Sequence, residues 1–352
     1  MTLENRISAF TKLGDFLSQF SKNSIEKKEN VQYNELFFDV FKTQIKRAKE
    51  FNGWFTDENV LFSIENWSKS LNKESLSKWT SAYHFNKNTD KTVAVIMAGN
   101  IPLVGFHDFL SVLISGNKAL VKLSSNDKTF LPLITKYLEH VESNFKGKIY
   151  FTEGKLEDFD AVIATGSNNT ARYFDYYFGK YPNIIRKSRN SVAVLTGNET
   201  LVELEKLGED IFRYFGLGCR SVSKLFAPAN YNFDNLFKAI YKYHDIINYP
   251  KYQNNYDYNK AVYLMSLFKL QENGFLMLKE DESYASPIAT LFYEYYNSES
   301  KLISKLNSDM DQIQCVVGNI ELKNTVSFGN TQSPRLSDYA DGVDTLQFII
   351  DL

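Results

Sequence analysis

The segment TVAVIMAGNIPLVGFHDFLSVLISGNKALVKL, residues 92–123, decides the fold class of this chain. It opens with the apolar run TVAVIMA (92–98), turns at GNIP, continues as a helical pattern over 104–115 and closes on ALVKL (119–123). Short apolar runs that are bounded by turn residues and alternate with helices are typical of βαβ units in a parallel sheet. Such runs are apolar throughout because helices cover both faces of the sheet.

The alternation continues beyond residue 123. We expect helices over 128–144 and 168–178, and strands over 148–152, 161–165 and 191–196. A long amphipathic helix over 199–215 and a strand over 221–227 then begin a second α/β unit. The last element, LQFII at 346–350, is expected to be a terminal strand.

Apolar side chains recur at helical spacing through the first 85 or so residues, which predicts a helical layer over the sheet or a wall of a substrate tunnel. We place a domain boundary near residue 197. The expected parts are a helical layer with a Rossmann-like parallel-sheet domain (1–197), a smaller α/β domain that carries Cys219 (198–327), and a C-terminal tail (328–352).

The composition is that of a globular protein and argues against two classes of partner. Hydrophobic residues make up 43% and charged residues 23%, and the net charge of −2 disfavours nucleic acid and anionic membranes. Aromatic residues reach 15%, which suits either an apolar channel or an aromatic core. The chain has only two cysteines, far apart in sequence, which excludes a disulfide framework. We find no secretory signal and no apolar run of the ~20 residues that a membrane span needs, so we expect a cytoplasmic protein.

Cys219 is the candidate nucleophile. It lies outside the apolar runs, in FGLGCRS, between Gly218 and Arg220. Glycine lets a ligand approach the backbone closely, and a neighbouring guanidinium favours the reactive thiolate. An inert buried cysteine is the alternative, and these residues alone leave both open. Cys315, in IQCVV, is expected to be a core residue of a strand.

Two loops are candidate ligand sites. TGSNNTAR (165–172) follows a strand and opens a helix, so its small residues either face a phosphate or nicotinamide or merely cap the helix through Ser167 or Asn168. Asn100 follows the first strand, where its amide suits an oxyanion, although local grounds favour a turn Asn before Pro102.

Metal and dinucleotide motifs are not expected. None of the four histidines has a second ligand at metal spacing, and His107 is expected to be a helix-face residue, with a site role as the weaker alternative. The G-x-G of FGLGCRS follows a helix and precedes a strand, whereas the dinucleotide fingerprint needs the reverse order.

Taken together, these motifs resemble the aldehyde dehydrogenase superfamily, and within it the LuxC-type acyl-CoA reductases. The resemblance covers about residues 90–352. It rests on the order of four features, namely a loop Asn after a strand, a strand Lys followed by small polar residues, a strand followed by TGS, and a Cys after a long helix. The segments that carry it are GNIPLVGFHDFLSVLISGNKALVKLSSND, RNSVAVLTGNE, FGLGCRSVSKLF and FGNTQSPRLSDYADGVDTLQFI.

The resemblance implies a role for each candidate. Cys219 would be acylated by a thioester, and Asn100 with the main-chain N–H of Cys219 would hold the oxyanion. The implied cofactor residues are Lys122, Ser124, Ser125, Gly166, Ser167 and Phe328, with Lys122 at the adenosine ribose and Phe328 near the nicotinamide riboside.

Two departures from the superfamily pattern are informative. NIIRKSRNSVAVL (183–195) has no carboxylate where hydrolytic members carry a Glu as base, which disfavours simple aldehyde oxidation. Ser125 stands where a Glu usually binds a ribose hydroxyl, and this favours NADPH over NADH.

The resemblance thus implies NADPH-dependent reduction of an acyl-CoA to the aldehyde. The alternatives are reduction of an acyl phosphate or acyl-carrier-protein thioester, or a role as an acyl-binding component of a reductase complex. A homo-oligomer and a synthetase or transferase partner are expected, with 340–352 as one candidate contact.

Overall fold

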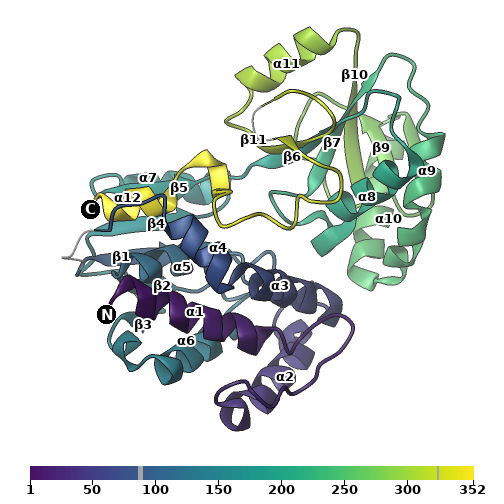
Figure 1. Ribbon diagram of the computed structural model, residues 1–352. Helices are drawn as coiled ribbons and strands as arrows, with labels where there is room; N and C mark the ends of the chain where they lie inside the picture. The colour runs from purple at the N-terminus through teal and green to yellow at the C-terminus, as the bar shows by residue number, and fades with distance from the viewer. Residues whose placement is uncertain (86–89, 323–324) are drawn as a thin grey trace. The chain divides into compact units, whose positions relative to one another are not determined.

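The computed structural model describes residues 1–85, 90–322 and 325–352, which fold into two compact units (Figure 1). The first unit contains Met1–Lys187 together with Arg335–Leu352, and the second contains Ser188–Pro334. Each unit is built on its own sheet and encloses its own apolar core. Within these described residues, no helix is both long enough and apolar enough to cross a membrane.

The sheet of the first unit has five parallel strands in the order β3-β2-β1-β4-β5. They are β1 Thr92–Ile96, β2 Lys118–Lys122, β3 Ile149–Phe151, β4 Ala161–Thr165 and β5 Asn183–Arg186. Ile96 pairs with both Lys122 and Ala164, so β1, β2 and β4 end together at one edge of the sheet. The loops that follow these three strands therefore meet at that edge.

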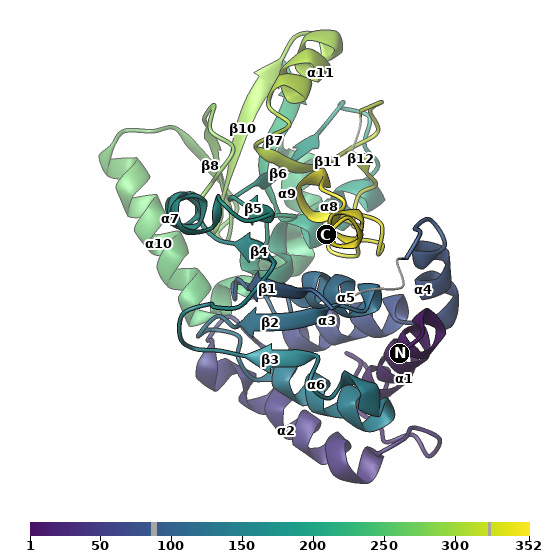
Figure 2. The same cartoon turned by 90° about the vertical axis from the view of Figure 1, so that its left-hand side faces the viewer.

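Helices cover both faces of this sheet, as the apolar strands predict (Figure 2). The helices of the first unit are α1 Leu3–Leu17, α2 Asn34–Phe51, α3 Asp57–Ser70, α4 Lys73–Thr80, α5 Phe106–Ser115, α6 Phe130–Val141, α7 Asn168–Phe178 and α12 Thr345–Ile350. The four N-terminal helices pack with α5 and α6 on one face, and α7 packs against β4 and β5 on the other. The N-terminal helical layer over the sheet is confirmed.

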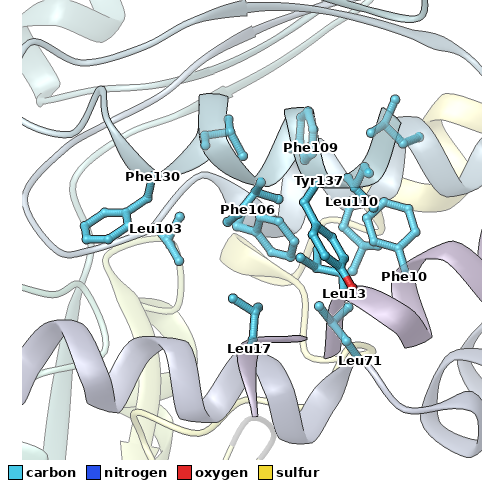
Figure 3. Close-up of a cluster of buried hydrophobic side chains, with 14 of the residues drawn as sticks. Phe10, Leu13, Leu17, Leu71, Leu103, Phe106, Phe109, Leu110, Phe130 and Tyr137 are labelled. Atoms are coloured by element: carbon cyan, nitrogen blue, oxygen red, sulfur yellow. The ribbon is translucent and has the colours of Figure 1, made fainter. Parts of the chain in front are cut away.

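The core beneath the helical layer is rich in aromatic rings (Figure 3). Phe10 of α1, Phe106 and Phe109 of α5 and Tyr137 of α6 are all buried there. Tyr137 stacks on Phe16 with ring centroids 4.4 Å apart. A large share of the aromatic residues of this unit therefore belongs to the core, as the second interpretation of the composition, an aromatic core, predicts.

The second unit has a seven-stranded sheet in the order β12-β11-β6-β7-β10-β9-β8, parallel except for the β8–β9 pair. Its strands are β6 Asn190–Val194, β7 Val222–Pro228, β8 Leu270–Glu272, β9 Met277–Glu280, β10 Thr290–Tyr296, β11 Ile313–Val317 and β12 Thr325–Val326. Its helices are α8 Leu201–Phe212, α9 Asp234–Ile240, α10 Pro250–Met265 and α11 Glu299–Ser308. One core joins α8 and α9 to the sheet, and a second joins α11 to its opposite face.

The second unit begins at Ser188, earlier than the boundary expected near residue 197. The reason is that β6, which the sequence reading placed in the first domain, pairs with β7 and β11. The segment expected to be a separate tail, 328–352, is divided at 334/335 between the two units. Both differences arise from strand pairing and packing between residues distant in sequence.

The prediction of a terminal strand at 346–350 is wrong, because these residues form α12. Asp344 caps the helix by accepting a hydrogen bond from the N–H of Gln347. Leu346 and Ile349 are buried in the core of the first unit, where α12 packs against α5. Residues three apart share one face of a helix, whereas in a strand they point to opposite faces.

Candidate active site

Cys219 lies in a loop that follows an abrupt end of α8. The helix ends at Phe212, and Tyr214, Phe215 and Gly216 take left-handed backbone angles, with φ of 55°, 58° and 76°. Such angles cost about 1–3 kcal/mol at a residue other than glycine, and they cluster at functional sites. Phe215 stacks on Tyr249, with ring centroids 4.8 Å apart, which helps to hold this turn.

The main chain on both sides of Cys219 is held by hydrogen bonds, and the residue itself is exposed. The Ser191 hydroxyl of β6 donates to the Cys219 carbonyl at 3.0 Å. The N–H of Ser221 donates to the Gly218 carbonyl, and the Ser221 hydroxyl accepts from the N–H of Gly218 and from the Gln332 side-chain amide. The loop thus presents an accessible thiol on a fixed backbone.

The other thiol, Cys315, is buried in β11 with 2% of its surface exposed, as predicted. Burial raises the pKa of this thiol to about 11, so it is protonated at neutral pH. Its Sγ lies 3.0 Å from the Ser191 hydroxyl. Because that hydroxyl donates to the Cys219 carbonyl, the Cys315 S–H is the donor to Ser191. The protonated thiol of Cys315 is a poor nucleophile.

A buried carboxylate of α8 organises the segment that follows β12. Asp210 accepts hydrogen bonds from the N–H of Gly329 at 2.6 Å and of Thr331 at 3.0 Å, and from the Thr331 hydroxyl at 2.8 Å. Arg220, the neighbour of Cys219, donates to the Thr331 carbonyl at 3.4 Å. The residues before and after Cys219 are therefore connected to Asp210 through this segment.

Phe328 belongs to the same segment, but its ring lies inside the apolar core of the second unit with 4% of its surface exposed. Its role beside a nicotinamide riboside stays a prediction.

In the first unit, the loop after β1 is fixed at several points. Asn52 donates to the Gly99 carbonyl at 3.1 Å, and a Cβ at Gly99 would lie 2.5 Å from the Ser124 hydroxyl oxygen, so a side chain here would displace Ser124. Leu103 has φ of 58°, and its N–H donates to Asp127 at 2.8 Å. Burial raises the pKa of Asp127 to about 6. Asn100 is exposed within this fixed loop.

Five of the predicted cofactor residues lie at or just past the ends of β2 and β4, at the edge where β1 also ends. Lys122 donates to the Gly154 carbonyl at 2.7 Å, while Ser124 approaches Gly99 and Ser125 is exposed. Gly166 and Ser167 link β4 to α7. Thus the structure brings Asn100 and these five residues to one edge of the first sheet, and it places Cys219 and Phe328 in the second unit.

Ser167 is the N-cap of α7, because its hydroxyl accepts a hydrogen bond from the N–H of Thr170 at 3.2 Å. This confirms the capping role that the sequence offered as one alternative. A contact with a phosphate or nicotinamide stays a prediction.

His107 is a helix-face residue of α5, as expected. Its Nε2 lies 2.9 Å from the Leu336 carbonyl, and its ring contacts the rings of Trp79 and Tyr339. Nowhere in residues 1–85, 90–322 and 325–352 do three or more His, Cys, Asp or Glu side chains gather closely enough to hold a metal ion.

The sequence of this chain matches the family described as Acyl-CoA reductase (LuxC) over residues 15–240, more than half of its length. The chain belongs to the LuxC acyl-CoA reductase family. The "Long-chain acyl-protein thioester reductase 2" of Photobacterium leiognathi is 24% identical over an alignment of 202 residues, and the alignment covers 52% of this chain and 41% of that protein. The chain thus matches less than half the length of this curated relative.

Solved aldehyde dehydrogenases share the fold of this LuxC family member. Aldehyde dehydrogenase 21 of Physcomitrella patens superposes with a TM-score of 0.70 at 10% identity, over 100% of this chain and 84% of that one. The NAD⁺ complex of an aldehyde dehydrogenase from Bacillus cereus gives a TM-score of 0.60 at 13% identity, over 91% and 73%. The predicted aldehyde-dehydrogenase-like α/β fold is confirmed.

The sequence analysis did not predict three residues that support the Cys219 loop, namely Ser191, Asp210 and Gln332. Asp210 could have been found from the sequence, because it follows Leu207 by three residues and precedes Ile211, which places it on the buried face of an amphipathic helix. A carboxylate on such a face is rarely buried unless it is paired. Ser191 and Gln332 have no comparable local signal, because they reach the loop only through the folding of the second sheet.

Proposed function

We propose that this chain reduces a fatty acyl thioester to the aldehyde through an acyl group bound to Cys219, with a nicotinamide nucleotide as the hydride source. The observation that carries the proposal is the exposed Cys219 thiol on a loop whose main chain is held on both sides, in a LuxC family member. The lack of a carboxylate in 183–195 agrees with discharge of the acyl group by hydride rather than by water.

The proposed chemistry divides one reduction into two easier steps. The Cys219 sulfur forms a bond to the acyl carbon as the bond to the departing thiol breaks, and the proton of Cys219 leaves with that thiol. After hydride addition, the carbon–sulfur bond of the resulting thiohemiacetal breaks as the aldehyde C=O forms, and a proton returns to Cys219. Asn100 and the N–H of Cys219 are our proposed donors to the oxyanion, and each such donor contributes about 3 kcal/mol.

The edge of the first sheet fits a nicotinamide nucleotide. Gly99 lets its loop close on Ser124 where a Cβ would collide, and Lys122 and Ser125 add a cation and an exposed hydroxyl suited to ribose and phosphate oxygens. The N-terminus of α7, after Gly166 and Ser167, suits a pyrophosphate. When bound, the nucleotide supplies the hydride. Ser125 places no negative charge beside a 2′-phosphate, which supports NADPH over NADH.

Two acyl donors remain in view. The family description favours acyl-CoA, whereas the name of the Photobacterium leiognathi relative favours an acyl group carried on a protein. Acyl-CoA is our first proposal, and a protein-borne thioester is the second. A synthetase or transferase partner, a homo-oligomer and a cytoplasmic location belong to the same proposal.

The test is oxidation of NADPH, and in parallel of NADH, by the purified chain. The substrates are acyl-CoAs from acetyl to palmitoyl, the same acyl groups on a carrier protein, and acyl phosphates. We expect NADPH oxidation that depends on acyl chain length. Cys219→Ala should abolish it, and Cys315→Ala, which changes only the buried thiol, should retain it.

Full activity in Cys219→Ala would contradict the mechanism. Oxidation with the carrier-protein substrates alone would instead select the protein-borne donor. NADH oxidation as fast as NADPH oxidation would remove the proposed cofactor preference.

A further inference from the structure

Asp210 is a carboxylate with no exposed surface, on the buried face of α8. Its three hydrogen-bond donors, the N–H groups of Gly329 and Thr331 and the Thr331 hydroxyl, are all neutral. Gly329 has φ of 83°, and a Cβ there would lie 3.0 Å from Cβ of Lys206, so its backbone conformation is specific to glycine. The carboxylate thus holds a sharply turned segment against α8.

The opposite side of this segment faces the Cys219 loop. The Thr331 carbonyl accepts from Arg220, and the Gln332 amide donates at 3.3 Å to the Ser221 hydroxyl. That hydroxyl also accepts from the N–H of Gly218. Residues 329–332 are therefore held by Asp210 on one side, and on the other they bind Arg220 directly and Gly218 through the Ser221 hydroxyl.

We propose that Asp210 is a positioning residue for Cys219, which fixes the nucleophile loop through residues 329–332. This inference rests on the proposed function, because it assigns Asp210 to the alignment of Cys219 with an acyl thioester. Asp210 cannot be replaced by an apolar side chain of similar volume without leaving the N–H groups of Gly329 and Thr331 unsatisfied. Its specific contribution is to accept two main-chain N–H bonds from one short segment.

The variant Asp210→Asn keeps the shape of the side chain and removes one of its two acceptor oxygens. We expect faster amide hydrogen exchange in residues 216–222, beyond the segment whose N–H groups bind Asp210, when the native protein is followed by mass spectrometry. Acylation of Cys219 by palmitoyl-CoA should slow by about 10- to 100-fold, since misplacement by about 1 Å costs that order of rate. Alkylation by iodoacetamide, which needs no alignment, should change by less than about threefold.

The matched control is Asp257→Asn, the same change at an exposed residue of α10 in the same unit. A milder pair guards against an unfolded variant, because Thr331→Val removes only the hydroxyl that donates to Asp210, and Thr331→Ser restores it. We expect slower acylation in Thr331→Val and recovery in Thr331→Ser.

Unchanged exchange of 216–222 in Asp210→Asn would overturn the positioning role, as would equal losses of alkylation and acylation. Equal acylation rates in Thr331→Val and Thr331→Ser would overturn it too. A wild-type chain that no thioester acylates contradicts the proposed function instead, and the exchange measurement still decides whether Asp210 fixes the loop.

Discussion

At the scale of single residues, the two thiols of this chain lie in opposite surroundings. Cys315 is enclosed in a strand, where burial raises its thiol pKa to about 11. Cys219 is exposed in a loop whose backbone is held by Ser191 and Ser221. Because the thiolate is the reactive form and burial disfavours it at Cys315, Cys219 is the better candidate nucleophile of the two.

The first prediction concerns the pH dependence of stability at Asp210. Burial, with a smaller push from Glu209, raises the pKa of this carboxyl from 3.8 to about 6 against the opposing effect of its three hydrogen bonds. A folded-state pKa above the unfolded value means that the protonated form favours folding. The stability that protonated Asp210 contributes is complete below about pH 4. It is lost as the pH rises through about 6, which lowers the free energy of unfolding by about 3 kcal/mol.

The measurement is urea unfolding of wild type and Asp210→Asn between pH 4.5 and 7, followed by circular dichroism. The stability of the wild type should fall relative to the variant as the pH rises. Asp257→Asn, at an exposed aspartate, should keep a constant offset from the wild type. A constant offset for Asp210→Asn as well would show that this carboxyl titrates normally.

At this scale, the sequence could single out Cys219 as a candidate nucleophile, because it lies outside the apolar runs beside Gly218 and Arg220. The residues that hold the Cys219 loop could not be predicted from the sequence. Gln332 lies far along the chain and reaches Ser221 only when β7 and the segment after β12 are both in place. Apolar periodicity, moreover, does not report a buried carboxylate such as Asp210.

At the scale of elements, long periodic segments were predicted well and short ones poorly. The helix expected over 168–178 is α7, with the same bounds, whereas α4 and the edge strand β5 were not predicted. The run at 346–350 is short and apolar except for Gln347, so its pattern does not distinguish a strand from a buried helix. The long helix expected to continue to 215 ends at Phe212, because Tyr214 and Phe215 adopt left-handed backbone angles. Helix propensity does not predict such angles.

A buried ion pair joins three elements of the first unit. The Arg186 guanidinium at the end of β5 binds the Asp108 carboxylate of α5 and donates to the Thr345 hydroxyl of α12 at 2.8 Å. All three side chains are buried. A charge buried in this way depends strongly on its partner.

We therefore expect Asp108→Asn to lower the free energy of unfolding by about 3 kcal/mol, because it leaves the Arg186 charge in the core without its carboxylate. The exposed pair Arg47–Glu50 provides the control, and Glu50→Gln should cost less than about 1 kcal/mol. Urea unfolding followed by tryptophan fluorescence measures both, since the three tryptophans, Trp54, Trp67 and Trp79, lie in the first unit. Equal midpoints for the two variants would contradict the structural role of the pair.

At the scale of the whole molecule, the chain leaves the first unit at Lys187 and returns to it at Arg335. The returning segment supplies Leu336, Leu346 and Ile349 to the first core. It also supplies Tyr339, whose hydroxyl accepts from the indole N–H of Trp79 at 2.7 Å. The C-terminal residues are thus an integral layer of a unit whose other residues come from the start of the chain.

Removal of 335–352 should therefore destabilise the first unit, because each large apolar side chain lost from a core costs about 2–5 kcal/mol. Tryptophan fluorescence should report unfolding at markedly lower urea in the truncated chain. Leu267→Ala, at a leucine that is 90% exposed, should leave the midpoint in place. An unshifted tryptophan transition in the truncated chain would refute this account of the tail.

The proposed mechanism depends most on the covalent step at Cys219. Intact-mass spectrometry of the chain incubated with palmitoyl-CoA, without a nucleotide, tests it directly. We predict a gain of one palmitoyl group that peptide mapping places on Cys219, that is absent in Cys219→Ala and that disappears when NADPH is added. An adduct that persists in Cys219→Ala, or that maps to another residue, would contradict the assignment of Cys219 as the nucleophile.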